Sequence, residues 1–437
     1  MNLRFHCTHL LFSLVLILWF LPAPAQQGAM KKRAIKEINA GEIKPGEKVI
    51  AIINATIIDG TGRQPIANGV VIIKGNKIEA AGASGKIVIP QNAEITDAKG
   101  MSLLPGLIDS HFHLDDMHGL PALFLQHGVT SVRDPGAWIE TYDAERKDGK
   151  MIPRLFLTGP HLDMYPPAYP DDAVVVRDSA EAIQQVDKLV ENGATAVKIY
   201  FRIPVNMIRQ VCNRMHQYGL PVTAHLEIAE AVQAIEAGLD GIEHITSFGQ
   251  SLVTQREAEK YRQSVLLDNN ARKQGRYDLW KMINVNSAKA DSLCRYIAKK
   301  KIFISPTLGA FEYQPSPDET DTTKLIAFSN MKSFTGKLKK AGARIVLGSH
   351  SSITYAEHGW AFQREMELFA ESGISNADII VAATMQNARY FHIDDKLGSI
   401  EKGKIADLIL IKGNPLADIS AMKNVEQVML NGVWVEK

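Results

Sequence analysis

Two histidines separated by one residue follow an apolar run and could bind a metal ion. The run covers residues 103–109, and His111 and His113 come after Ser110. Side chains two residues apart in an extended chain point to the same face, so both imidazoles can project together from the end of a strand. Imidazole is a common ligand of zinc and similar ions. Ordinary buried polar residues remain the alternative for one or both, unless the chain supplies further ligands.

The elements that would position such a site alternate along the middle of the chain. Asp178 and Glu181 could cap a helix with an apolar stripe, which Gly193 ends, and a strand-like segment follows. This cycle of helix, glycine and strand recurs as far as residue 245. Such alternation predicts a parallel sheet with right-handed crossovers. The candidate strands are residues 104–111, 129–134, 154–159, 194–200, 221–226, 241–245, 302–307 and 344–348.

This strand pattern predicts an α/β protein, and eight parallel strands favour a closed (β/α)8 TIM barrel over an open sheet. We place the barrel in residues 104–393. Residues 250–300 form a longer connection than one crossover between parallel strands needs, which predicts inserted helices. These helices could be a lid over the barrel mouth or a peripheral insertion. Short β-branched segments in 46–103 and 394–437 predict a small β-sandwich domain formed by both termini, with antiparallel strands that include residues 86–89.

Catalytic residues of a TIM barrel lie at the C-terminal ends of its strands, so each strand end tests the metal hypothesis. The fourth strand ends near Lys198, the fifth at His225 and the sixth at His244. With His111 and His113, four histidines and a lysine therefore converge on one rim. A buried lysine can lose its charge by desolvation, or it can be carboxylated to a carbamate that bridges two metals. A salt bridge inside the barrel is the alternative for Lys198.

This order of residues resembles the amidohydrolase superfamily, in particular its imidazolonepropionase-like and Xaa-Pro dipeptidase (prolidase)-like members. Residues 104–113, 382–388 and 398–408 carry the most recognisable segments, and the resemblance covers essentially the whole mature chain. It implies that His111 and His113 bind one ion, that His225 and His244 bind a second, and that carboxylated Lys198 bridges them. The expected cofactors are two divalent metal ions, Zn²⁺ before manganese, iron or cobalt.

One departure from the family concerns the eighth strand, which in its members ends with an aspartate that binds metal and takes a proton from the attacking hydroxide. Here His350 follows Gly348 and Ser349 at that place. Its reference pKa of about 6.5 suits a general base at neutral pH, so we expect His350 to be the catalytic residue. The site would be one negative charge short. Glu357 or His358 is the alternative base.

Substrate contacts are expected after the third and fourth strands. His161 could polarise a substrate carbonyl, although a role in stabilising its loop is equally open. Tyr200 and Arg202 could receive an oxygen or a carboxylate of the substrate. A solvated surface position is the alternative for Arg202.

The leading functional hypothesis is hydrolysis of a carbon–nitrogen bond in a peptide, an N-acyl amino acid or a cyclic amide by metal-activated hydroxide. A noncatalytic binding protein is the second hypothesis, because His350 replaces the aspartate, and a single-metal enzyme is the third. The 49 Lys and Arg against 48 Asp and Glu leave no charge surplus for nucleic acid or an acidic membrane. The expected partner is a small-molecule or peptide substrate, and homo-oligomerisation is left open.

Residues 1–25 have the pattern of a secretory signal peptide. A start containing Arg4 precedes an apolar run at 10–21, and Ala23 and Ala25 form a small-residue cleavage site. We therefore expect a periplasmic or secreted protein with no membrane contact after cleavage. An uncleaved anchor is disfavoured, because a span needs about 20 apolar residues. Cys212 and Cys294 remain in the mature chain, as buried thiols or as one disulfide.

Overall fold

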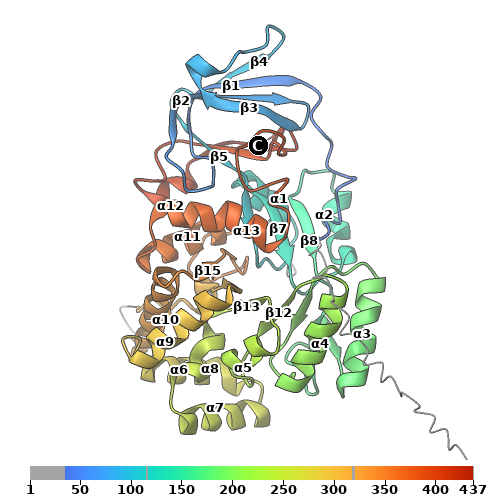
Figure 1. The fold of residues 1–437 in the computed structure, drawn as a ribbon, viewed down its shortest axis with the longest axis vertical. Coiled ribbons are helices and arrows are strands. Elements are labelled where there is room, and N and C mark those ends of the chain that lie inside the picture. The colour runs from blue at the N-terminus through green and yellow to red at the C-terminus, as the bar shows by residue number, and fades with distance from the viewer. Residues whose placement is uncertain (1–34, 115–116, 317–319, 437) are drawn as a thin grey trace, which may run out of the picture.

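The computed structural model describes residues 35–114, 117–316 and 320–436, so the expected signal peptide lies outside the described residues. Hydrogen bonds arrange the strands in an eight-stranded, a seven-stranded and a three-stranded sheet (Figure 1). The eight-stranded sheet contains β1 (Val49–Ile57), β2 (Ile66–Lys74), β3 (Lys77–Ala83), β4 (Glu94–Asp97), β5 (Ser102–Pro105), β16 (Leu408–Ile411), β17 (Val425–Leu430) and β18 (Val433–Trp434).

Segments from both ends of the chain build this one mixed sheet. Its order is β18-β17-β16-β5-β1-β2-β3, and β5 joins the two parts by pairing antiparallel with β16 and parallel with β1. The antiparallel strand expected at residues 86–89 is wrong. Val88 is 89% exposed and has no core to cover it, and Pro90 lacks the amide hydrogen that a ladder needs. The later segment β4 pairs with β1 instead, in parallel.

The other two sheets are parallel throughout, which confirms the α/β class. The three-stranded sheet contains β6 (Leu107–Asp109), β7 (Val129–Asp134) and β8 (Arg154–Leu157). The seven-stranded sheet contains β9 (His161–Asp163), β10 (Ala173–Val175), β11 (Val197–Ile199), β12 (Val222–His225), β13 (Gly241–Glu243), β14 (Phe303–Ser305) and β15 (Arg344–Ile345).

The ladders of the described strands do not form one continuous ring, and a backbone hydrogen bond joins the two parallel sheets on one side. On one side the Ser110 amide donates to the Leu347 carbonyl at 3.0 Å, just beyond the ends of β6 and β15. On the other side the chain before β1 reaches β8, where Glu37 forms an antiparallel bridge with Phe156. The three-stranded sheet keeps chain order, whereas in the seven-stranded sheet β10 lies outside β9 at the edge.

The first predicted strand, at residues 104–111, is two strands in the structure. β5 belongs to the mixed sheet, β6 begins the parallel strands, and Gly106 lies between them. A Cβ atom at Gly106 would lie 2.2 Å from the Oγ1 atom of Thr130 on β7. Only a residue without a side chain allows this close crossing, so the chain changes sheets here. His111 and His113 consequently lie in the loop beyond β6.

Replacing Gly106 by alanine is expected to lower the free energy of unfolding by about 1–3 kcal/mol, because the added methyl group overpacks the contact with Thr130. Denaturant unfolding of the variant would measure this loss. Gly85→Ala is the matched control, since a Cβ atom there meets nothing within 4 Å. Equal stability of both variants would show that the crossing tolerates a side chain.

Helices cover the parallel strands (Figure 1). They are α1 (Leu120–Gln126), α2 (Asp143–Lys147), α3 (Ser179–Glu191), α4 (Val205–Gln217), α5 (Ala231–Glu236), α6 (Gly249–Leu252), α7 (Gln255–Leu267), α8 (Ala271–Met282), α9 (Ala288–Lys300), α10 (Thr322–Lys340), α11 (Ala361–Glu371), α12 (Asn376–Val381) and α13 (Asn387–Tyr390). Asp178 caps α3 as expected, by accepting a hydrogen bond from the Glu181 amide. The predicted insertion is helical and comprises α7, α8 and α9.

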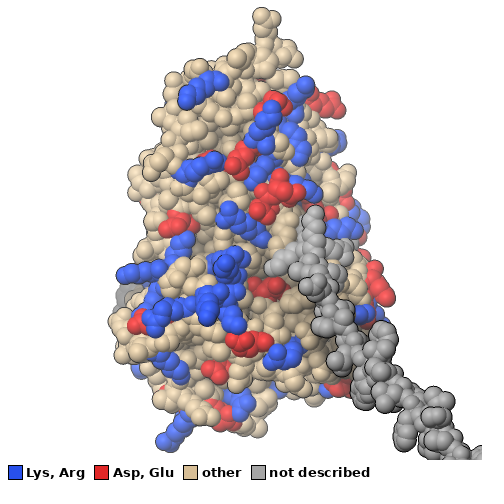
Figure 2. Space-filling model, viewed as in Figure 1, with Lys and Arg blue, Asp and Glu red and all other residues tan. Residues whose placement is uncertain are grey.

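Four apolar clusters support this arrangement. The largest cluster lies among the parallel strands and their helices, and a smaller one lies under the mixed sheet, where Ile52, Leu408 and Met429 are fully buried. Cys212 and Cys294 are free and buried, which confirms the thiol interpretation. Among the described residues, no helix has the length and apolar character that a membrane span requires. Basic and acidic side chains are interspersed over the face drawn in Figure 2.

Candidate metal centre

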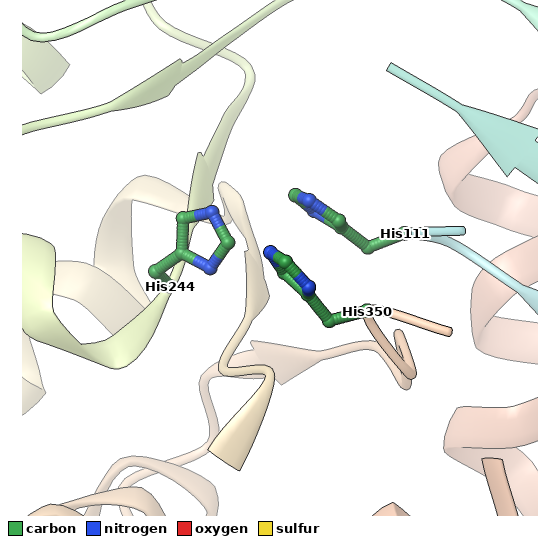
Figure 3. Close-up of side chains that lie close together, drawn as sticks. All are labelled: His111, His244 and His350. Atoms are coloured by element: carbon green, nitrogen blue, oxygen red, sulfur yellow. The ribbon is translucent and has the colours of Figure 1, made fainter. Parts of the chain in front are cut away.

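Three histidine side chains converge where the parallel strands end (Figure 3). Ring nitrogens of His111, His244 and His350 all lie within 4.8 Å of one another. The His111 and His350 rings stack with centroids 5.3 Å apart, and the His244 ring centroid lies 4.7 Å from that of His111. These residues follow β6, β13 and β15, so their meeting point is at the carboxyl ends of three strands.

The remaining predicted ligands surround this cluster. The Nε2 atom of His113 lies 3.1 Å from Nε2 of His111, and the His225 ring centroid lies 4.5 Å from that of His244. Lys198, on β11, is 4% exposed. No carboxylate of the described part of the chain forms an ion pair with the Lys198 ammonium, which leaves the alternative of a salt bridge without support.

Each of the four predicted histidine ligands has one ring nitrogen held by a neighbouring oxygen. The contacts are His111 Nδ1 with Glu243 at 2.8 Å, His113 Nδ1 with Asp134 at 3.5 Å, His225 Nε2 with Glu227 at 2.8 Å and His244 Nδ1 with Thr307 at 2.6 Å. Such oxygen partners fix the ring orientation of metal-binding histidines and leave the second nitrogen free. That nitrogen is buried without a partner in His225, as an absent ligand would leave it. The residues therefore fit a divalent metal.

An ion pair lies beneath His111 in the interior. Arg133 and Glu243 are 1% and 0% exposed, and the guanidinium donates to the carboxylate at 2.7 Å. The second oxygen of Glu243 is the one that contacts His111. Burial alone would raise the pKa of Glu243, but the positive charges of Arg133 and Lys198 outweigh it and hold that pKa below its usual value. Glu243 is thus a carboxylate that orients His111.

Burial sets the charge of four predicted ligands in a way that suits metal binding. It lowers the pKa of Lys198 to about 8 and that of His225 to about 4. It also lowers the pKa values of His111 and His244 well below the usual range. Neutral imidazole is the form that ligates a metal, and a lysine with a lowered pKa more readily provides the free amine from which a carbamate forms.

The loop that carries His350 is held by Asp109. The Asp109 carboxyl group accepts hydrogen bonds from the Ser349 amide at 3.0 Å, the Ser349 hydroxyl at 2.5 Å and the His111 amide at 2.9 Å. The amide of His350 donates to the His111 carbonyl at 2.7 Å, and His350 has a left-handed backbone with φ of 60°. This geometry turns the side chain of His350 into the cluster.

The alternative bases lie outside the cluster. Glu357 and His358 are exposed. Glu357 lines a surface cavity of about 390 Å³ together with Tyr355 and Trp360. The structure therefore favours His350 over either of them as the group nearest the predicted ligands.

Two of the three predicted substrate-binding residues face the cluster. The Tyr200 ring centroid lies 4.8 Å from that of His225 and 4.5 Å from that of His161. The Nε2 atom of His161 is buried without a partner, and burial lowers the pKa of this histidine to about 3. Arg202 is directed elsewhere, because its guanidinium donates to Asn269 at 2.8 Å and to the Val265 carbonyl at 3.0 Å. Arg202 thus anchors the connection between α7 and α8.

The sequence interpretation missed the residues that hold the ligands. Arg133 is the penultimate residue of β7 and Glu243 is the last residue of β13, and charged residues in buried strands are rarely unpaired. That pattern could have indicated an internal ion pair between β7 and β13. Asp109 and Asp134 end their strands, where carboxylates beside a histidine site could also have been considered.

Comparison with known proteins agrees with this geometry. The model of the Amidohydrolase family matches residues 102–435. A Bifidobacterium longum protein assigned as a prolidase superposes with a TM-score of 0.69 at 25% identity, over 90% of this chain and 96% of that chain. A Xaa-Pro dipeptidase with bound methionine has the same fold, with a TM-score of 0.67 at 23% identity, over 89% of this chain and 100% of that one.

Sequence matches to curated proteins are partial. A dihydroorotase from Geotalea daltonii is 28% identical over 171 residues, which are 35% of this chain and 39% of that protein. The match to a second curated protein, an adenine deaminase from Staphylothermus marinus, covers 15% of that protein. The chain thus spans less than half the length of either curated relative.

Proposed function

The chain belongs to the amidohydrolase family, and from this premise we propose that it is a metal-dependent hydrolase that cleaves a carbon–nitrogen bond of an amide. The proposed substrate is a dipeptide, an N-acyl amino acid or a cyclic amide. A metal centre in this position would lower the pKa of bound water toward neutrality and polarise the amide carbonyl. The residues of the chain would hold, orient and deprotonate the reactants.

One observation carries this proposal. Four histidines from three regions of the chain each have one ring nitrogen fixed by an oxygen, beside a buried lysine that lacks an ion-pair partner in the described structure. Buried histidines commonly have a hydrogen-bond partner, so the weight rests on the convergence of four oriented rings around one lysine, which is the arrangement that metal ligands adopt. The proposed ligands are His111, His113, Lys198, His225 and His244.

We propose that two ions, Zn²⁺ foremost, occupy the site, with Lys198 carboxylated and bridging them. His350 is the proposed proton acceptor, and its neutral imidazole stacks directly on His111. Tyr200 and His161 would contact the substrate. We propose that the parallel strands form a (β/α)8 barrel and that all these residues lie on one rim of it.

Protein purified without chelators is expected to contain divalent metal, and removing it should abolish amide hydrolysis. Elemental analysis by mass spectrometry would give the number of ions per chain, which separates the two-metal from the single-metal arrangement. Activity toward dipeptides and N-acyl amino acids should return when Zn²⁺ is added back. Absence of bound divalent metal, together with unchanged turnover after chelation, would contradict the proposal.

We further propose that the protein is exported through its N-terminal signal and acts in the periplasm or outside the cell. Mass spectrometry of the mature N-terminus would test this, with Gln26 as the expected first residue. A chain that retains Met1 would contradict cleavage.

A further inference from the structure

Two arginines of the inserted helix α8 lie buried or half-buried without a carboxylate partner. Arg272 is 3% exposed, and its guanidinium donates to the Asn269 carbonyl at 2.6 Å and to the Tyr169 hydroxyl at 3.2 Å. Its Nε atom is buried and has no partner. Within the described residues, Arg272 has no ion pair. Its guanidinium carbon lies 5.5 Å from the centroid of the Tyr169 ring and 5.3 Å from that of the Phe201 ring, so aromatic faces offset part of the charge, and a carboxylate from outside the chain would supply the missing counter-charge.

Arg276 lies one helical turn after Arg272 and on the same face of α8. Its guanidinium carbon is 5.2 Å from the centroid of the Phe311 ring. That ring contacts His244 edge to face, with centroids 5.7 Å apart. Arg276 is half-buried and, in the part of the chain that the structure describes, also lacks an ion pair. One aromatic ring therefore separates its positive charge from the predicted metal ligands.

The local charges do not balance. Glu227 is a carboxylate within electrostatic reach of both arginines, but it already accepts from His225 at 2.8 Å and from the Tyr261 hydroxyl at 2.5 Å. Both guanidinium groups also act on the hydroxyl of Tyr200, which lies beside His225. Two guanidinium charges thus face a single occupied carboxylate at the edge of the site.

We propose that Arg272, Arg276 and Tyr200 form a subsite for the α-carboxylate of the substrate. This inference rests on the proposed function and narrows its substrate to a dipeptide or an N-acyl amino acid, in which the carboxylate is one carbon away from the scissile nitrogen. Guanidinium groups bind carboxylates through two parallel hydrogen bonds, which fixes the orientation of the amide as well. A cyclic amide without a carboxylate would leave the subsite empty. The insertion that carries α8 then determines specificity.

The test uses ligands that cannot be hydrolysed. In 2-methyl-4-oxopentanoic acid, a methylene group replaces the amide nitrogen of N-acetylalanine, and 2-methyl-4-oxopentanamide is the matched ligand without the carboxylate. Titration calorimetry with zinc-loaded protein is expected to show about 10- to 100-fold tighter binding of the acid than of the amide, the range for hydrogen bonds to charged groups. Arg276→Gln should remove most of this preference, and Arg276→Lys should restore part of it.

Two further variants complete the design. Arg272→Gln should also reduce the preference for the acid over the amide. If this substitution of a buried residue prevents folding, the substitution of the half-buried Arg276 still tests the subsite. Lys273→Gln is the matched control, because Lys273 is exposed on the same helix, and it should preserve the preference. Equal binding of acid and amide by the wild type, or an unchanged preference in Arg276→Gln, would overturn the subsite.

The subsite and the proposed function can fail separately. Hydrolysis of N-acyl amino acids and of their carboxamides with equal kcat/KM would overturn the subsite and leave the hydrolase intact. Arginine-dependent preference for the acid, without hydrolysis of any N-acyl amino acid or dipeptide, would support the subsite while contradicting the proposed function.

Discussion

Replacing Glu243 by alanine is expected to lower the free energy of unfolding by about 3–5 kcal/mol, because Arg133 would remain buried without its counter-charge. The guanidinium is 1% exposed, so it cannot turn to solvent without opening the interior. Its other acceptors are the Ser110 carbonyl and the hydroxyl groups of Thr223 and Tyr390, which are uncharged and cannot replace the carboxylate. Urea unfolding of wild type and variant, compared at equal metal loading, would measure the loss.

The same substitution should weaken metal binding by about 10- to 100-fold, since His111 would lose the partner that orients its ring. Glu243→Gln keeps an oxygen acceptor and should lose less affinity. The double variant Arg133→Met with Glu243→Leu replaces the ion pair by apolar side chains and should recover stability without recovering metal affinity. If Glu243→Ala retains both the stability and the metal affinity of the wild type, the ion pair supports neither the fold nor the site.

The parts of the site that could be predicted are those that depend on position along one strand. His225 ends β12 and His244 directly follows β13, so the strand pattern alone placed them on the rim. The pairing of Arg133 with Glu243 could not be obtained in this way, because it depends on which strands face each other across the interior. A ladder of strands specifies neighbours, whereas contacts across a core depend on twist and side-chain length.

Backbone geometry explains the other differences between sequence and structure. The break at Gly106 arises from close contact with Thr130, which lies 24 positions later in the chain. The left-handed conformation of His350 is unusual for a residue with a side chain, and it is held in place by contacts with the His111 and Asp109 region. The helical insertion was expected, but the contact of Arg202 with Asn269, in the loop that precedes α8, was not.

Replacing His350 by alanine is expected to lower kcat for amide hydrolysis by about 10²- to 10⁴-fold, the contribution usual for a general base. The imidazole stacks on His111 and lies among the three clustered rings, so alanine would leave no proton acceptor at this place. His350→Asp should retain more activity, because a carboxylate can accept the same proton and supplies the negative charge that the resemblance to the family leads us to expect. His358→Ala is the matched control, since His358 is exposed and outside the cluster.

Metal content decides what a loss of activity in His350→Ala means. A variant that keeps its ions but loses turnover assigns His350 to proton transfer, whereas a variant that loses an ion assigns it to metal binding. Unchanged kcat would remove His350 from the mechanism. If the metal-loaded wild type binds amides without turnover and His350→Asp hydrolyses them, the histidine marks a binding protein derived from an enzyme. Burial lowers the pKa of His350 well below its usual range, so the imidazole is neutral and can accept a proton, but it holds that proton less strongly than an exposed histidine does.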